Sequence, residues 1–579
     1  MHVWNVPDNY YDSDSCRQYS SSSDAQGETI LSKEGCDFAS ASMVTQAVGK
    51  NAGWCTAGGH VLKALRGQRE NMRKKAVVWG RIAMAKSDQH RQNGSRQVQY
   101  DAKAVADAGA QRRDLRVSAP VQVGQEVVMT IDGLSSTGDG VGRTRGFAVF
   151  VPGALVGEEI ACTVECVKKN YARAILDRVI TPSPERAEPM CDLYPSCGGC
   201  QLLHLSYEGQ LAAKRQRVVD AVTRIGGLDD VKVHPVIGMA DPWRYRNKVQ
   251  HPVGTRDDEL VTGCYMGGTH EVVPTEDCHI QHQASMAIIA TVRRLAREFG
   301  LSVYDEASRQ GMLRNVLVKY AYGTGKAMVV LVTNGAGFPG GRGVEFGARI
   351  AQDHPEVKSV IQNVNTARGS MVLGRKNIVL WGEETITDRM EGLAFRISAT
   401  SFYQVNPIQT VTLYRKALEY ARLDGTERVL DAYCGVGTLS LFLARAAREV
   451  YGIESVGEAV RDARANADLN RIDNARFIVG RVEDVLPRLV REGVTFDVAV
   501  VDPPRAGCDP AVLQALAGNK KSDAGVKRIV YVSCNPSTMA RDLKVLDELG
   551  YIACEIQPVD MFPHTFHVET VVLMSRVKV

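Results

Sequence analysis

The sequence predicts an α/β protein with a parallel sheet in its C-terminal part and a small β-barrel nearer the N-terminus. Two observations support this fold class. From residue 394 onward, short apolar strands alternate with helices, which is typical of a parallel sheet. Between residues 121 and 179, short runs rich in valine and isoleucine are separated by glycine-rich turns, as in antiparallel barrels. The region between these two parts contains a group of cysteines.

The size and composition of the chain indicate a multidomain globular protein. It has 579 residues, of which 44% are hydrophobic, and at about 100–200 residues per domain this predicts three or four units. No apolar run approaches the roughly 20 residues that cross a bilayer, and the N-terminus lacks the pattern of a secretion signal. The 14 cysteines are therefore expected to be reduced thiols, metal ligands or nucleophiles. We expect a cytoplasmic protein without a membrane partner.

The first 116 residues differ from the rest in charge. Residues 1–62 carry a net charge of −4, and residues 63–116 carry +9. The basic part also contains Gln, Asn, Ser and Gly, which predicts a flexible arm able to meet polyanions. The other interpretation is a solvated extension without a function, which composition favours for residues 1–62. We expect residues 1–116 to be a disordered extension that is basic from residue 63.

A small barrel is expected over residues 117–180. Its clearest strands are the valine-rich runs at 126–131 and 146–151, and a Thr-Pro-Ser-Pro linker follows at 181–184. The glycine-rich segment 134–142, with the strand after it, resembles a TRAM domain, which is an RNA-binding barrel. This part of the chain therefore predicts contact with RNA.

Four cysteines beyond the barrel are candidate metal ligands. Three thiols, spaced by five and two residues in a glycine-containing loop, can converge on one centre, and a fourth is available farther along. Four thiolates suit either an iron–sulfur cluster or a structural zinc ion. The short Cys-Gly-Gly-Cys end, without a second pair at zinc-ribbon spacing, favours a four-iron, four-sulfur (4Fe–4S) cluster. The alternative is buried thiols without a metal. The candidates are Cys191, Cys197, Cys200 and Cys278.

A glycine loop follows the first strand of the C-terminal part. That strand ends at Asp431, and the loop Ala432-Tyr-Cys-Gly-Val-Gly437 leads into an apolar helix. A second strand ends in Glu454, 17 positions after Gly437, where a carboxylate can accept hydrogen bonds from ribose hydroxyls. Ser440 stands where the dinucleotide fingerprint has its third glycine, so the loop favours S-adenosylmethionine over NAD. The alternative role for Glu454 is a helix-capping acid.

Later strands bring further polar groups to the same edge of the sheet. The strand 496–501 runs into Asp502-Pro-Pro-Arg505, whose prolines make a rigid loop at the ligand-binding edge of α/β sheets. The strand 528–533 is followed by Cys534 and an Asn-Pro turn, a position that favours a reactive thiol over a small core residue. Glu569 precedes the final strand, and its alternative role is a surface acid.

Together these motifs resemble the RNA uracil-5-methyltransferase family, most of all its iron–sulfur-containing members that modify 23S rRNA and carry an N-terminal TRAM domain. The resemblance covers about residues 117–579, and residues 1–116 lie outside it. It rests on the four cysteines and on Ser401-Phe-Tyr-Gln-Val-Asn-Pro407, Asp431-Ala-Tyr-Cys-Gly-Val-Gly437, Asp502-Pro-Pro-Arg505, Ser533-Cys-Asn-Pro536 and His567-Val-Glu569.

The resemblance implies a domain order and partners. Residues 396–579 would form a Rossmann-like, S-adenosylmethionine-dependent methyltransferase domain, and residues 185–395 a central α+β domain that holds the cluster. The helical stretch near 203–234 would pack with the catalytic domain. The implied substrate is RNA, with 23S rRNA favoured and tRNA as the alternative. We expect a monomer.

The resemblance also implies roles for individual residues. Cys534 would be the nucleophile and Glu569 the base. The basic motif Trp243-Arg-Tyr-Arg-Asn-Lys248 is suited to phosphates and stacked bases, or else it is a salt-bridged strand or helix. The implied S-adenosylmethionine contacts are Gln404, Tyr433, Glu454 and Asp502.

The reaction explains why a thiol and a carboxylate are needed. Uracil C5 is a weak nucleophile, and thiolate addition at C6 makes C5 reactive enough to accept a methyl group. A base must then remove the proton from C5. Two other classes fit less well: radical methylthiotransferases use a Cys-x3-Cys-x2-Cys spacing that this sequence lacks, and a non-catalytic ribosome-assembly factor would not need Cys534 or Glu569.

Overall fold

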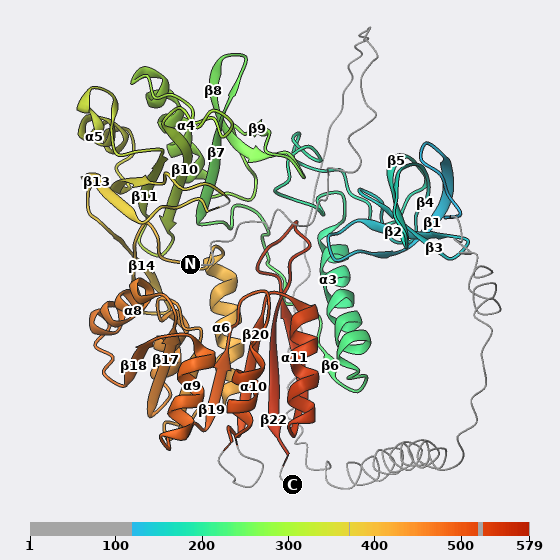
Figure 1. Ribbon diagram of the computed structural model, residues 1–579, viewed down its shortest axis with the longest axis vertical. Helices are drawn as coiled ribbons and strands as arrows, with labels where there is room; N and C mark the ends of the chain where they lie inside the picture. Colours follow the sequence, from blue (N-terminus) through green and yellow to red (C-terminus); the bar gives the residue numbers. More distant parts are fainter. Residues whose placement is uncertain (1–118, 370, 519–524, 578–579) are drawn as a thin grey trace, which may run out of the picture. The chain divides into compact units, whose positions relative to one another are not determined.

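The computed structural model describes residues 119–369, 371–518 and 525–577 (Figure 1). The extension expected at 1–116 lies outside these residues. Within the described part of the chain, no helix is both long and apolar enough to cross a membrane.

The first described domain is a closed five-stranded barrel, as the glycine-separated strands predict. Along its first strand, Val127, Met129 and Ile131 are buried and alternate with exposed residues, which places one face of the strand in the core. Gly142 is required on the second strand, because a Cβ there would lie 2.5 Å from the Met129 sulfur. The strands are β1 (Glu126–Leu134), β2 (Gly140–Thr144), β3 (Phe147–Val151), β4 (Glu159–Val167) and β5 (Tyr171–Thr181).

A seven-stranded mixed sheet follows, in the order β13-β12-β11-β10-β7-β8-β9. Only β11 and β12 pair in parallel. The strands are β7 (Lys248–Arg256), β8 (Glu259–Tyr265), β9 (Val272–Pro274), β10 (Leu313–Ala321), β11 (Lys326–Thr333), β12 (Val357–Val364) and β13 (Lys376–Gly382). The helices of this region are α4 (Gln283–Glu298), the 3-10 turn η4 (Pro339–Gly341) and α5 (Gly343–Asp353).

Both faces of this central sheet are covered, so β10 and β11 are buried along almost their whole length. On one face, Val316 and Val318 share a core with α4 and α5. On the other face, Leu317 belongs to a core that also contains the hairpin β14 (Ile386–Met390) and β15 (Leu393–Ile397) and residues of the C-terminal domain. The central and C-terminal domains therefore share a hydrophobic core.

The C-terminal domain contains the predicted parallel sheet, in the order β18-β17-β16-β19-β20-β22-β21-β6 (Figure 1). Strand β22 runs antiparallel to both of its neighbours. The strands are β16 (Arg428–Ala432), β17 (Glu449–Glu454), β18 (Ala475–Val479), β19 (Val498–Val501), β20 (Arg528–Ser533), β21 (Tyr551–Val559) and β22 (Glu569–Arg576). The helices are α6 (Pro407–Ala421), α7 (Thr438–Ala444), α8 (Gly457–Leu469), α9 (Val482–Arg491), α10 (Pro510–Ala517) and α11 (Pro536–Glu548).

A segment that precedes the central sheet in the chain completes the C-terminal domain. It consists of α3 (Tyr207–Ala221), the π-helical turn η3 (Val222–Gly226) and β6 (Lys232–Val233). Strand β6 extends the sheet by pairing in parallel with β21. Val218 of α3 shares a core with Leu543 of α11. Helix α3 therefore packs on the C-terminal domain beside α11.

Candidate active site

The candidate site residues gather at one edge of the C-terminal sheet because of its topology. Glu454 ends β17, Asp502 follows β19, and Cys534 follows β20, so all three lie at the carboxyl ends of parallel strands. Strand β22 runs the opposite way, so its first residue, Glu569, meets the same edge. Ligands of α/β proteins bind at this edge.

Strand pairing brings Cys534 next to Glu569. The β20–β22 ladder ends with Ser533 opposite Thr570, and the next position along this register places Cys534 opposite Glu569. The Thr570 hydroxyl donates to the Ser533 carbonyl over 3.2 Å, which holds the two strand ends together. Burial raises the pKa of the Cys534 thiol, and the charges of Glu569 and Asp502 raise it further. The thiol and both carboxylates are therefore close enough to interact.

The two carboxyl groups at this edge have raised pKa values. Burial raises the pKa of Glu569 to about 8, and the neighbouring charge of Asp502 contributes to the shift. Burial alone raises the pKa of Asp502 to about 6. A buried carboxyl with a pKa near neutrality is suited to proton transfer.

Arg505 supplies positive charge beside these acids. It opposes the rise in the pKa of both Glu569 and Cys534. Its main chain is fixed, because its carbonyl accepts hydrogen bonds from the Asn535 amide and the Thr538 hydroxyl, each over 3.0 Å. The loop after β19 and the turn after β20 are thereby joined.

The glycine loop after β16 is closed against the end of β17. The main-chain N–H groups of Tyr433 and Cys434 both donate to the Ile453 carbonyl over 3.0 Å, and Tyr433 has a φ of 70°. The Gly435 N–H donates to the Glu454 carboxylate over 3.3 Å. These hydrogen bonds join the glycine loop to the end of β17, and the Tyr433 side chain packs against the core that contains Cys508.

Cys434 is the second thiol near this edge, and it is packed inside the protein. Only 7% of its surface is exposed. A Cβ added to Gly452 would lie 2.8 Å from its sulfur, so the thiol fills the space over β17. Its surroundings suit packing better than attack on a substrate.

Gln404 lies in the segment that joins the two large domains. Its carbonyl accepts a hydrogen bond from the Asn247 amide over 3.0 Å, and the Asn247 N–H donates to the Val405 carbonyl over 2.8 Å. Asn406 caps α6 and also donates to the Met561 carbonyl over 3.1 Å. Main-chain contacts thus hold the Gln404 segment between β7 and the loop before Glu569.

The four candidate ligand cysteines lie in one region. Cys200 has Cys191, Cys197 and Cys278 close enough that their charges affect its pKa, which burial raises. A fifth cysteine, Cys264 of β8, hydrogen-bonds to the Cys197 sulfur and was not expected from motif spacing. Among residues 119–369, 371–518 and 525–577, no group of three or more Cys, His, Asp or Glu side chains is arranged to hold a metal ion. Three of the four candidate thiols come from one loop and the fourth from a distant segment, and four thiols are the donor set that an iron–sulfur cluster takes.

The basic motif at 243–248 has structural contacts of its own. Arg244 forms a bidentate ion pair with Asp277, with both N–O distances 2.6 Å. Tyr245 is buried, and its hydroxyl donates to the Pro563 carbonyl over 3.1 Å. Arg244 therefore has the ion pair that the alternative expects, but residues 243–247 lie before β7 and not in a helix or strand, and Tyr245 is held by burial and a hydrogen bond.

Two family models match this chain. A model of the tRNA (Uracil-5-)-methyltransferase family matches residues 358–577, which include the candidate catalytic residues and the candidate S-adenosylmethionine contacts. A TRAM domain model matches residues 120–176, which form most of the barrel. The TRAM resemblance is therefore confirmed.

Relatives and solved structures extend the match over most of the chain. An uncharacterized RNA methyltransferase of Bacillus cereus (strain ATCC 10987 / NRS 248) is 50% identical over 463 residues, covering 80% of this chain and 99% of the relative. One from Clostridium tetani is 46% identical, over 80% of this chain and 98% of the relative. The crystal structure of the Pyrococcus abyssi tRNA (uracil-54, C5)-methyltransferase in complex with S-adenosyl-L-homocysteine is 30% identical, covers 77% of this chain and 99% of that one, and has a TM-score of 0.61. Given this identity over nearly whole relatives, the chain belongs to the RNA uracil-5-methyltransferase family and is an S-adenosylmethionine-dependent RNA methyltransferase.

Proposed function

We propose that the protein methylates C5 of a uridine in 23S rRNA through a covalent bond between Cys534 and uracil C6. The observation that carries this proposal is the meeting of Cys534 and Glu569 at adjacent strand ends, with Asp502 close to both. A half-buried thiol beside a buried carboxylate is the pair that this chemistry needs.

In the first step, the Cys534 sulfur forms a bond to uracil C6, and the electrons of the C5–C6 double bond move towards C5 and the O4 carbonyl. C5 then has the electron density to take a methyl group. The thiol must lose its proton first, and burial beside two acids opposes this in the free protein. Arg505 favours the thiolate, and a positively charged ligand in the site would favour it as well.

In the last step, Glu569 accepts the proton from C5. The C5–H electrons re-form the C5–C6 double bond, the C6–S bond breaks, and Cys534 leaves as a thiolate. A carboxyl with a pKa of about 8 holds a proton more firmly than an ordinary glutamate, which makes its carboxylate form the stronger base.

We assign the S-adenosylmethionine site to Gln404, Tyr433, Glu454 and Asp502. When bound, S-adenosylmethionine supplies an electrophilic methyl group on a positively charged sulfur. Glu454 stands at the position that binds ribose hydroxyls in sheets of this kind. Asp502 and Glu569 place negative charge at the same edge, which suits a sulfonium.

The raised pKa values of Asp502 and Glu569 lead to a prediction about pH. As pH rises from 6 to 9, Asp502 and then Glu569 lose protons, because their pKa values are about 6 and about 8. The site gains negative charge, so S-adenosylmethionine should bind more tightly relative to S-adenosylhomocysteine, whose sulfur is neutral. A change of about tenfold in the ratio of the two Kd values corresponds to one pKa unit of coupling. Calorimetric titration of both ligands across this range measures it.

The two ligands share an amino group and a carboxylate, so the titration of those groups cancels in the ratio. Glu569→Gln should flatten the upper part of the curve, near pH 8. A ratio that stays constant from pH 6 to 9 in the wild-type protein would contradict the placement of Asp502 and Glu569 close to the sulfonium.

We also propose that Cys191, Cys197, Cys200 and Cys278 hold a 4Fe–4S cluster. Support comes from the electrostatic contact of Cys200 with the other three thiols. Four protein thiolates would close the coordination of the cluster, which suits a structural role.

Protein purified without oxygen should be brown and contain about four irons per chain, as four thiolates around one cluster require. Cys278→Ser should lose this iron, whereas Cys264→Ser, the matched control on β8, should keep it. Iron analysis and the visible spectrum measure both. Stoichiometric zinc without iron, or loss of iron in Cys264→Ser alone, would contradict the proposed ligand set.

The domain boundaries that accompany this function are 117–180 for the barrel, 185–395 for the central domain and 396–579 for the catalytic domain. Within 185–395, the stretch near 203–234 belongs with the catalytic domain, because β6 joins its sheet.

An open pocket of about 540 Å³ lies beside the start of α6 and is lined in part by Trp243, His282 and the exposed Tyr322. Aromatic side chains in an open pocket suit unstacked bases of a single-stranded RNA loop.

The choice between ribosomal and transfer RNA can be tested directly. The proposed cluster favours 23S rRNA by resemblance, whereas the Pyrococcus abyssi structure is of a tRNA enzyme. A deletion strain should lack 5-methyluridine at one or more positions of 23S rRNA and keep it in tRNA. Loss from tRNA alone would replace the rRNA proposal by the tRNA one, and unchanged 5-methyluridine in both would contradict the function.

A further inference from the structure

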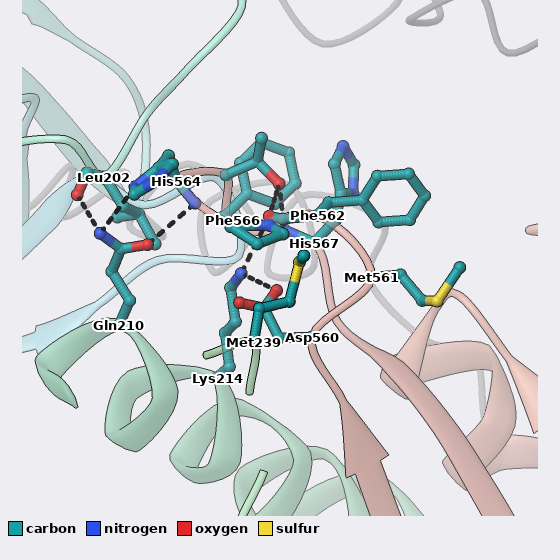
Figure 2. A network of polar contacts seen from close by, with 12 residues as sticks. Leu202, Gln210, Lys214, Met239, Asp560, Met561, Phe562, His564, Phe566 and His567 are labelled. Carbon is teal, nitrogen blue, oxygen red and sulfur yellow. Dashed lines mark hydrogen bonds and ion pairs between the residues drawn. The ribbon is translucent and has the colours of Figure 1, made fainter. Parts of the chain in front are cut away.

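The loop between β21 and β22, residues 560–568, is held by side chains from distant parts of the chain. It begins at Asp560 and ends directly before Glu569. Figure 2 shows that α3 points several side chains at this loop, among them Gln210 and Lys214. A helix that precedes the central sheet in the sequence thus contacts the loop that leads into Glu569.

Lys214 makes the innermost of these contacts. Its side chain is 1% exposed, and its Nζ atom lies 2.6 Å from the Asp560 carboxylate and 3.0 Å from the Phe562 carbonyl (Figure 2). The other Asp560 oxygen accepts a hydrogen bond from the Tyr207 hydroxyl over 3.0 Å. Burial lowers the pKa of Lys214, and the Asp560 charge partly offsets this.

The middle of the loop is held through its main chain. The His564 N–H donates to the Gln210 side-chain oxygen over 2.9 Å, and the His564 carbonyl accepts from the N–H groups of Gln201 and Leu202 over 3.0 Å each. Arg217 of α3 donates to the Phe566 carbonyl over 2.7 Å. These contacts come from α3 and from the residues directly after Cys200.

A buried ion pair contributes little to stability, because removing two charges from water costs about as much as their attraction returns. Stability alone therefore does not account for a lysine that is aimed at the loop before Glu569. Such pairs instead favour one arrangement of the groups that they join. The groups joined here are helix α3 and the first residues of the loop that ends at Glu569.

We propose that Lys214 is a positioning residue for proton removal: through Asp560 and the Phe562 carbonyl it holds the loop that places Glu569 against the substrate carbon. This inference rests on the proposed function. Cys534 belongs to another turn, which Arg505 and Thr538 hold. Loosening the loop should therefore slow the last step and spare thiol addition and methyl transfer.

The test uses the full-length double variant Lys214→Met/Asp560→Asn, which removes both charges and leaves no buried ion unpaired. The matched control is Gln216→Met, an exposed residue on the same helix whose side chain bonds only to Asp220. We expect the double variant to form the methylated protein–RNA adduct at the wild-type rate and to release product about 100-fold more slowly, the cost of a small misplacement of a reacting group. Single-turnover assays with denaturing gels measure adduct and product separately.

Three results overturn the positioning role: normal release, slowing of all steps in proportion, or an unchanged rate of hydrogen exchange at the amides of residues 561, 562 and 564–568 compared with Gln216→Met. The exchange measurement does not depend on the reaction. If wild-type protein transfers no methyl group while the double variant exchanges faster in this loop, the proposed function fails and the loop contact stands. If the wild-type protein transfers methyl groups normally and the double variant shows unchanged hydrogen exchange in this loop, the positioning role fails and the proposed function stands.

Discussion

Cys534→Ala should lose methyl transfer to RNA by more than about 1,000-fold, because without the thiol uracil C5 has no route to a reactive form. The variant should form no adduct that survives denaturation. It should keep most of its RNA affinity, since phosphate and stacking contacts lie elsewhere. The loss is measured as transfer of a labelled methyl group from S-adenosylmethionine to an RNA transcript. Mass spectrometry identifies the product nucleoside.

Cys554→Ala is the matched control, because this exposed thiol lies on β21, away from the carboxyl edge. It should leave transfer unchanged. The competing thiol is Cys434, which is buried in the glycine loop. Loss of the adduct in Cys434→Ala together with its persistence in Cys534→Ala would show that the nucleophile is Cys434.

The edge of the sheet could be predicted from the sequence because its signals are local. Each of three apolar strands is closed by a polar residue next to a turn or a glycine loop. These residues are Glu454, Asp502 and Cys534. In a parallel sheet all such ends meet on one side, so three separate local patterns predict one site. Glu569 required more, because it starts a strand, and only the antiparallel direction of β22 brings it to this edge.

Other parts of the site depend on contacts between residues far apart in the chain. Lys214 and Asp560 are 346 positions apart, and neither lies in a motif with recognisable spacing. Cys264 meets Cys197 because the end of β8 pairs with the cysteine loop: the Gly198 N–H donates to the Tyr265 carbonyl over 3.0 Å. Such contacts follow from tertiary packing, which periodicity along the sequence does not encode.

The interpretation of basic residues also depended on tertiary structure. A run of Arg, Tyr and Lys at 243–248 is equally consistent with RNA binding and with ion pairing. The structure places Asp277 beside Arg244, an arrangement that their separation by 33 positions does not reveal. A charged motif predicts function only where its charges have no partner inside the fold.

Glu569→Gln should stop the reaction after methyl transfer and trap the enzyme on its RNA. Glutamine has the shape of glutamic acid but cannot accept the C5 proton, so turnover should fall by about 100- to 10,000-fold, the usual contribution of a general base. Cys534 and the methyl-donor site remain, so the first two steps should proceed. The expected product is a denaturation-resistant protein–RNA band that carries the labelled methyl group.

The fold should tolerate this change, because a carboxyl with a pKa of about 8 is mostly uncharged at pH 7 and glutamine is uncharged as well. Glu548→Gln, at the exposed end of α11, is the matched control and should turn over normally without a trapped band. In the wild-type enzyme, single-turnover release should quicken as pH rises through about 8, because only the deprotonated carboxyl can take the proton. Normal turnover by Glu569→Gln would mean that another group or a water molecule removes the proton, and a trapped band without methyl would place Glu569 before methyl transfer.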